Sequence, residues 1–165
     1  MDGRAVSNRL IVVGCGRAKL DRPAPARELY TGNLFRAARQ YAEASGAEWK
    51  ILSALHGLID PAVVIGPYDY RIGQTTGTPW SYYRPEFERL CQVGYSTMPP
   101  IWKDKSGNGH DLLNLSERTV EIYASGAYAI ALRVALHGFP IKFEEPLDGL
   151  TMGGRLAWYA SRRSR

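Results

Sequence analysis

The sequence predicts a single α/β domain over residues 1–165, built as three layers, α/β/α, around a mainly parallel sheet of four or five strands. Three observations support this fold class. Short aliphatic runs recur along the chain, and each ends in a small-residue or polar loop. Segments with apolar residues spaced by three and four separate several of these runs. A chain of 165 residues that is 45% hydrophobic and 22% charged is long and apolar enough for one packed core.

The first third of the chain has the pattern of a β-α-β unit. Residues 10–13 form the first predicted strand, and a glycine-flanked turn follows at residues 14–19. Helical spacing predicts one helix over residues 27–44, closed by the glycine at position 46. Residues 49–52 form the next strand, and the connection implies that the two strands are parallel.

The middle of the chain has no clear periodicity. We expect a loop over residues 60–70 and an irregular insertion at about 71–117, with one short helix around residues 85–93. Aromatic and basic residues alternate in the insertion, a pattern suited to stacking on bases and neutralising phosphates, although the same residues can cover the sheet. These residues are Trp80, Tyr82, Tyr83, Arg84, Tyr95, Trp102, Lys103 and Lys105.

The last third returns to a regular pattern. Strands are predicted at residues 119–123 and 140–143, with a helix over residues 128–136 between them. A final helix is predicted near residues 155–161, with Asp148 or Thr151 as its N-terminal cap.

Composition narrows the classes of partner. The 21 basic and 16 acidic residues leave a net charge of +5, which favours an anionic partner such as DNA or a nucleotide. No apolar run is long enough to span a bilayer and the start lacks a secretory signal, so we expect a cytoplasmic protein without a membrane partner. Two cysteines and three scattered histidines predict neither a disulfide framework nor a metal site, and no cofactor motif is present.

Polar side chains follow the predicted strands, where ligands bind in parallel α/β sheets. The turn at residues 14–19 combines glycines with two cations, features suited to phosphate, although it lacks the P-loop pattern. The alternative is a tight turn in which the cysteine is a small apolar residue. The candidate substrate-binding residues are Cys15, Gly16, Arg17, Lys19, Tyr30, Ser53, Tyr68, Ser125 and Tyr128.

Three residues are candidates for catalysis. His56 follows a strand end and is suited to polarising a leaving base, or else it ties down its own loop. Asp69, next to Tyr68, is suited to orienting water or stabilising an oxocarbenium-like charge, and the alternative is a local turn. Glu145 follows the fourth strand and is either a catalytic carboxylate or a solvated strand end.

The motifs resemble those of a bacterial and phage domain family of unknown function. They read CGxxK at residues 15–19, APARELYTGxLF at 24–35, ILSAxHGLIDP at 51–61, PYD at 67–69 and PLxGLxMGxRLAWY at 146–159. The family resembles uracil-DNA-glycosylase-like α/β domains, including those found beside archaeosine and other deazaguanine transglycosylase modules. The resemblance implies chemistry at a nucleobase or an N-glycosidic bond.

Together these observations predict an enzyme that releases or modifies a nucleobase, in the manner of a DNA glycosylase. A non-catalytic DNA- or nucleotide-binding module on the same fold is the first alternative. A hydrolase or transferase of free nucleotides is the second.

Overall fold

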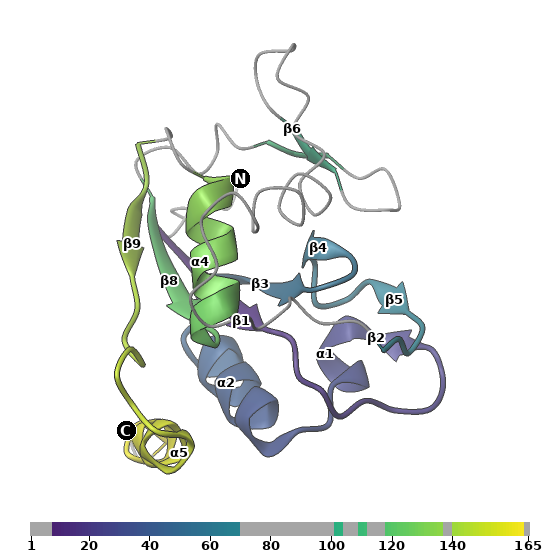
Figure 1. Cartoon of the computed structure of the whole chain (residues 1–165), viewed down its shortest axis with the longest axis horizontal. Helices are drawn as coiled ribbons and strands as arrows, with labels where there is room; N and C mark the ends of the chain where they lie inside the picture. Colours follow the sequence, from purple (N-terminus) through teal and green to yellow (C-terminus); the bar gives the residue numbers. More distant parts are fainter. Residues whose placement is uncertain (1–7, 70–100, 104–108, 112–117, 137–139, 164–165) are drawn as a thin grey trace, which may run out of the picture.

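A five-stranded sheet with the strand order β4-β3-β1-β8-β9 organises the protein (Figure 1). The structure is a computed structural model, and it describes residues 8–69, 101–103, 109–111, 118–136 and 140–163. The strands of this sheet are β1 (Arg9–Gly14), β3 (Glu48–Ser53), β4 (Gly57–Ile59), β8 (Thr119–Tyr123) and β9 (Lys142–Glu144).

The sheet is mainly parallel, as predicted. β1 pairs in parallel with β3 on one side and β8 on the other, and β9 extends the parallel set beyond β8. The four predicted strands are all present, with ends that differ by one or two residues. Because these strands run in one direction, their carboxyl ends meet at one edge of the sheet.

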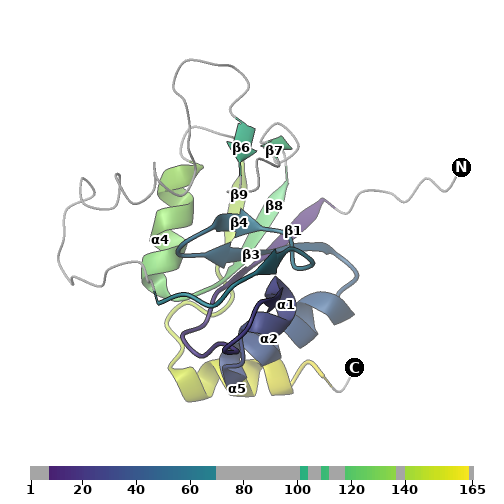
Figure 2. The same cartoon turned by 90° about the vertical axis from the view of Figure 1, so that its right-hand side faces the viewer.

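Apolar side chains cover both faces of the sheet. Along β1, Leu10 and Val12 pack on one face with α4 (Gly126–Ala135), whereas Ile11 and Val13 pack on the other with α2 (Asn33–Ala44). This alternation follows from the two-residue period of a strand. Figure 2 shows α4 on one side of the sheet, and α2 with α5 (Met152–Ala160) on the other.

The single helix predicted over residues 27–44 is wrong, because the chain breaks between α1 (Ala26–Leu29) and α2. Tyr30 adopts an extended backbone and forms an isolated bridge with Lys19. The Leu20 N–H donates to Leu29 O, and the Thr31 N–H donates to Ala18 O. Backbone groups that would have continued the helix therefore pair with the segment after β1, and this pairing fixes the position of Tyr30.

Strand β4 was missed by the sequence prediction. It folds back on β3 as an antiparallel hairpin in which Ser53 faces Gly57. Gly57 has a φ of 76°, a left-handed conformation that closes such short hairpins. The hairpin is too short to show a period-two pattern. A second small pairing, β2 (Ala24–Pro25) with β5 (Val64–Ile65), also lies in segments predicted as loops.

Most of the predicted insertion lies outside the described residues, including the helix expected at 85–93. Its described parts are β6 (Ile101–Lys103) and β7 (Gly109–Asp111), which pair antiparallel. No described helix is long and apolar enough to cross a membrane. Within the described ranges, no group of His, Cys, Asp and Glu has an arrangement that could hold a metal ion.

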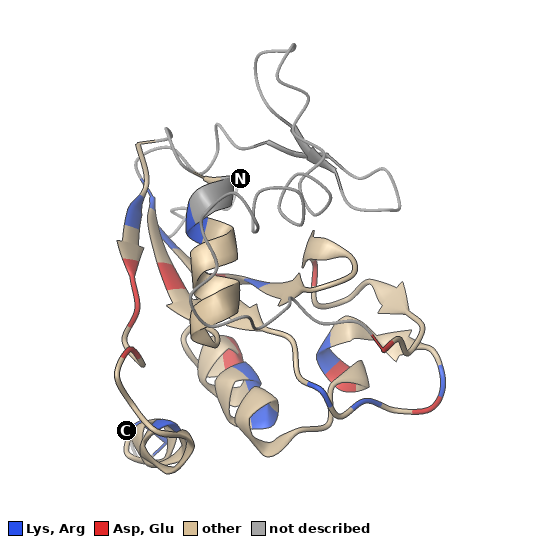
Figure 3. Ribbon diagram, viewed as in Figure 1, with Lys and Arg blue, Asp and Glu red and all other residues tan. Residues whose placement is uncertain are grey.

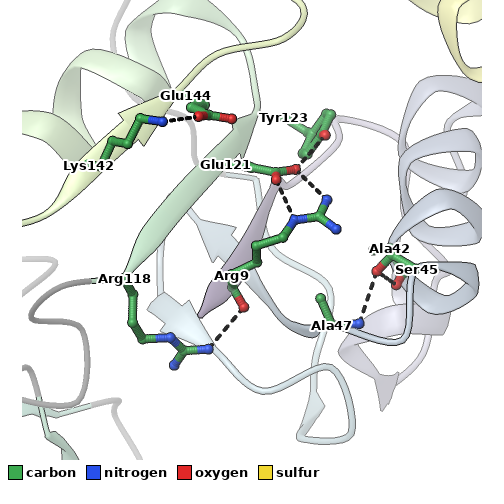
Figure 4. Close-up of polar contacts among 9 residues, drawn as sticks. All are labelled: Arg9, Ala42, Ser45, Ala47, Arg118, Glu121, Tyr123, Lys142 and Glu144. Carbon is green, nitrogen blue, oxygen red and sulfur yellow. Dashed lines mark hydrogen bonds and ion pairs between the residues drawn. The ribbon is translucent and has the colours of Figure 1, made fainter. Parts of the chain in front are cut away.

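A buried carboxylate, Glu121, lies on β8 beside Tyr123, on the face of the sheet that α2 covers (Figure 4). Glu121 accepts two hydrogen bonds from Arg9, at 2.6 and 3.0 Å, and a third from Tyr123 at 2.8 Å. Burial alone would raise the pKa of Glu121, but these hydrogen bonds and the Arg9 charge outweigh burial and lower it. The cluster joins the start of β1, at Arg9, to the carboxyl-terminal end of β8, at Tyr123.

Helix α5 begins earlier than predicted, at Met152. Thr151 is its N-terminal cap, as expected for one of the two candidates, and its hydroxyl accepts from the Gly154 N–H at 3.2 Å.

Candidate functional site

A cavity of about 120 Å³ opens where β1 and β8 end. The strand order explains its position, since the chain leaves β1 toward β3 on one side and later returns to β8 on the other. The loops after β1 and β8 therefore diverge, and in open α/β sheets this switch point is where ligands bind. The lining residues are Val13, Gly14, Cys15, Gly16, Leu34, Phe35, Ala38, Tyr123, Ala124, Ser125, Tyr128, Leu147, Arg155 and Tyr159.

Gly14 lets the two strand ends approach at the mouth of this cavity. A Cβ atom at Gly14 would lie 2.8 Å from the Cβ of Ala124 and 3.1 Å from its Cα. No side chain fits in that space without displacing the backbone of the strand end. Glycine is therefore required here by the close packing of β1 against the residue that follows β8.

Cys15 and Tyr128 meet across the cavity. Cys15 continues β1 through its N–H, which donates to Leu52 O at 3.0 Å. Its thiol donates to the Tyr128 hydroxyl on α4 at 3.7 Å. Ser125 lines the same cavity at the start of α4 and is exposed. The structure thus brings together three of the predicted site residues, with Gly16 beside them.

Helix α5 adds two residues that the sequence analysis did not select, Arg155 and Tyr159. The Arg155 guanidinium donates to Ala124 O at 3.0 Å and to Leu150 O at 3.1 Å. Tyr159 is 1% exposed, and its hydroxyl has no hydrogen-bond partner in the described part of the chain. The signal available in the sequence was the RLAWY end of the C-terminal motif, in which these residues are four apart and share one helix face.

A chain of three buried or half-buried hydroxyls lies beside Cys15. The Tyr68 hydroxyl is 2.7 Å from Ser53 Oγ and 2.8 Å from the Tyr30 hydroxyl. Ser53 Oγ also accepts from two backbone N–H groups, those of Leu55 and His56. A hydroxyl oxygen has two lone pairs, so Ser53 must donate to Tyr68. The Tyr68 hydrogen is then free for a bond to Tyr30.

The pKa shifts agree with this direction. Burial, together with the nearby Cys15, raises the pKa of Tyr30 to about 12. Burial, followed by the nearby Cys15 and Tyr30, raises the pKa of Tyr68 further, and the hydrogen bond that Tyr68 donates to Tyr30 adds a smaller increase. The series of hydroxyl hydrogen bonds therefore ends at Tyr30, next to the turn that follows β1.

Lys19 folds back onto this hydroxyl chain. Its ammonium donates to Gly16 O at 3.1 Å and Arg17 O at 3.2 Å, and it lies 4.4 Å from the centre of the Tyr68 ring. Arg17 is exposed at the tip of the turn. Figure 3 shows that basic positions are spread over several elements and do not gather on one helix. Lys19 thus shapes the turn after β1, and its predicted contact with phosphate stays a prediction.

The three predicted catalytic residues lie in different surroundings. The His56 ring packs edge-on against Tyr68, with ring centres 5.4 Å apart, in the β3–β4 hairpin. Asp69 is exposed directly after Tyr68. Glu145 forms an ion pair with Arg133 of α4 and does not line the cavity. The structure therefore places His56 and Asp69 near the hydroxyl chain and Glu145 away from it.

Residues 10–83 match the model of a family of unknown function, DUF6884. The chain is also similar to the uncharacterized protein YfjM of Bacillus subtilis (strain 168), with 36% identity over 101 residues. That alignment covers 56% of this chain and 66% of YfjM, so the chain spans just under two thirds of that relative. No solved structure matches the chain. The expected resemblance to a family of unknown function is supported over the matched residues, and neither name carries an activity.

Proposed function

We propose that this chain is a three-layer α/β/α enzyme that acts on a nucleobase or its N-glycosidic bond in DNA or in a nucleotide. One observation carries the proposal: the cavity at the β1–β8 switch point combines an apolar wall with a thiol, hydroxyls and a guanidinium. Ligand sites in proteins have this composition, an apolar surface with a few polar groups that fix orientation. The net charge of +5 suits a phosphate-bearing substrate.

The proposed roles follow from position. Cys15, Ser125 and Tyr128 bind the substrate in the cavity. His56, whose ring packs against Tyr68, supplies the general acid that N-glycosidic cleavage needs. Asp69, the residue after Tyr68, supplies the carboxylate. Glu145 is the weaker candidate, because Arg133 already neutralises its charge.

A base-release assay tests the proposal. Modified and unmodified DNA, RNA and free nucleotides are incubated with the protein, and released bases are measured by chromatography. We expect Asp69→Asn to lose about 10²- to 10⁴-fold in base release while retaining substrate binding. Glu145→Gln is the matched control and should stay within a few fold of wild type. Equal losses in both variants would contradict the assignment.

A non-catalytic binding module is the second candidate, and one observation favours it. None of the described residues that line the cavity is Asp or Glu, so a carboxylate must reach the substrate from outside the lining. Salt-dependent binding of DNA or nucleotides with no base released from any substrate would establish the module and exclude the enzyme.

A further inference from the structure

We propose that the cavity binds the phosphate group of the substrate, through Ser125, Arg155 and Tyr159. This inference rests on the proposed function in one respect only, that the phosphate belongs to a nucleotide. The turn after β1 is the site that the sequence favoured for phosphate. The structure instead brings one donor from the residue before α4 and two from α5 to one cavity.

Arg155 is a cation held in place by two backbone carbonyls, and no anionic partner lies beside it in the described part of the chain. Two backbone carbonyls orient its guanidinium and engage two of its N–H groups. A guanidinium has five N–H donors, so others remain for a ligand. Among the described residues no carboxylate pairs with Arg155, and it is half-buried at the cavity wall. A partly desolvated cation of this kind is stabilised by a ligand oxygen that carries negative charge.

Tyr159 presents a second unused donor. Its side chain is 1% exposed and lines the cavity, and no described group hydrogen-bonds its hydroxyl. Burial raises the pKa of Tyr159 while the nearby Arg155 charge opposes the rise, so the phenol keeps its hydrogen at neutral pH. Buried hydroxyls are normally paired, and an oxygen bound at Arg155 would satisfy this one.

The third contribution comes from the start of α4. This helix has ten residues and begins at Gly126, and Ser125, Tyr128 and the preceding Ala124 line the cavity. The first N–H groups of a helix lack intrahelical partners, and together with the helix dipole they favour an anion. The Ser125 hydroxyl adds a donor that has no partner among the described residues.

The volume of the cavity and the contacts of Lys19, the other candidate cation, both favour phosphate binding in the cavity. The cavity of about 120 Å³ is smaller than the roughly 150 Å³ that hold a benzene ring in an engineered protein. A cavity of this size suits a phosphate group and is too small for a whole nucleotide, so the rest of the substrate must lie outside it. Lys19, the rival cation, already donates to two carbonyls and stacks on Tyr68.

Calorimetric titration of the whole chain tests the proposal with three probes: inorganic phosphate, a nucleoside 5′-monophosphate and the corresponding nucleoside. We expect the monophosphate to bind more tightly than the other two. Arg155→Gln should weaken monophosphate binding by roughly 10- to 100-fold, the effect of losing a charge-assisted hydrogen bond. Arg163→Gln removes the same charge from the exposed turn that follows α5 and should change affinity little.

Tyr159→Phe separates binding from folding. The Tyr159 hydroxyl has no described partner to lose, so its removal should leave the melting temperature equal or higher while weakening the monophosphate several-fold. A lower melting temperature with unchanged affinity would show a purely structural role and overturn the proposal.

Three further results would overturn it: a nucleoside that binds as tightly as its monophosphate, inorganic phosphate that binds equally well, or a larger loss in Lys19→Ala than in Arg155→Gln. Expected phosphate binding without any base release would leave this inference standing and refute the enzymatic function. Base release that does not depend on Arg155, Tyr159 or the phosphate would support the enzymatic function and refute the phosphate-binding inference.

Discussion

Replacing Gly14 by alanine should destabilise the protein at the mouth of the cavity. The added Cβ would lie 2.8 Å from the Ala124 Cβ and 3.1 Å from its Cα, so one strand end must move. Overpacking of this kind costs about 1–3 kcal/mol. Alanine recovers roughly 0.5–1 kcal/mol, because glycine loses more backbone freedom on folding. We therefore expect a net loss of up to about 2.5 kcal/mol in the free energy of unfolding, centred on about 1 kcal/mol, together with weaker ligand binding.

Urea denaturation followed by tryptophan fluorescence measures this loss. Gly16→Ala is the matched control, since its added Cβ would meet only the Phe35 Cβ at 3.7 Å, an ordinary contact. Combining Gly14→Ala with Ala124→Gly removes the shorter contact but leaves the Cα at 3.1 Å, so the double variant should recover most of the loss but not all. A Gly14→Ala protein as stable as Gly16→Ala would refute the reasoning.

Three other predictions concern buried polar groups. Tyr68→Phe removes the centre of the hydroxyl chain, so the Ser53 O–H loses its acceptor and the Tyr30 hydroxyl loses its donor. The free energy of unfolding should fall by about 1–3 kcal/mol in the same assay, and no change would mean that water replaces the lost bonds. Glu121→Gln should destabilise the protein at pH 7. Because the pKa of Glu121 is lowered by folding, its contribution is present above about pH 4.3 and lost as the pH falls further, so the gap between variant and wild type should narrow in acid. Thr151→Ala removes the cap of α5 and should cost about 1 kcal/mol, seen as faster amide exchange in the first turn of that helix.

The candidate site was predicted only in part. Of the candidate residues that follow strands of the parallel sheet, Cys15, Ser125 and Tyr128 line one cavity, whereas Lys19, Ser53 and His56 do not. Ser53 and Tyr68 belong to a separate hydroxyl chain, which no local pattern indicates. The roles proposed for all of these residues stay predictions.

Two features escaped prediction for physical reasons. Tyr30 was assigned to a helix, since local spacing cannot reveal that residues 29–31 pair with the backbone of residues 18–20. Arg155 and Tyr159 were read as part of an ordinary helix, because their cavity exists only once α5 packs beside the ends of β1 and β8.

The sequence by itself determined the mainly parallel α/β class, the four parallel strands and the general position of their polar loops. These properties depend on apolar runs and turn residues that lie a few positions apart, so each can be recognised within one short segment of the sequence. The order of the strands, the switch point between β1 and β8 and the cavity beside Gly14 were decided only by the tertiary structure. They depend on packing between segments more than a hundred residues apart, such as Gly14 against Ala124, and no local pattern encodes such a contact.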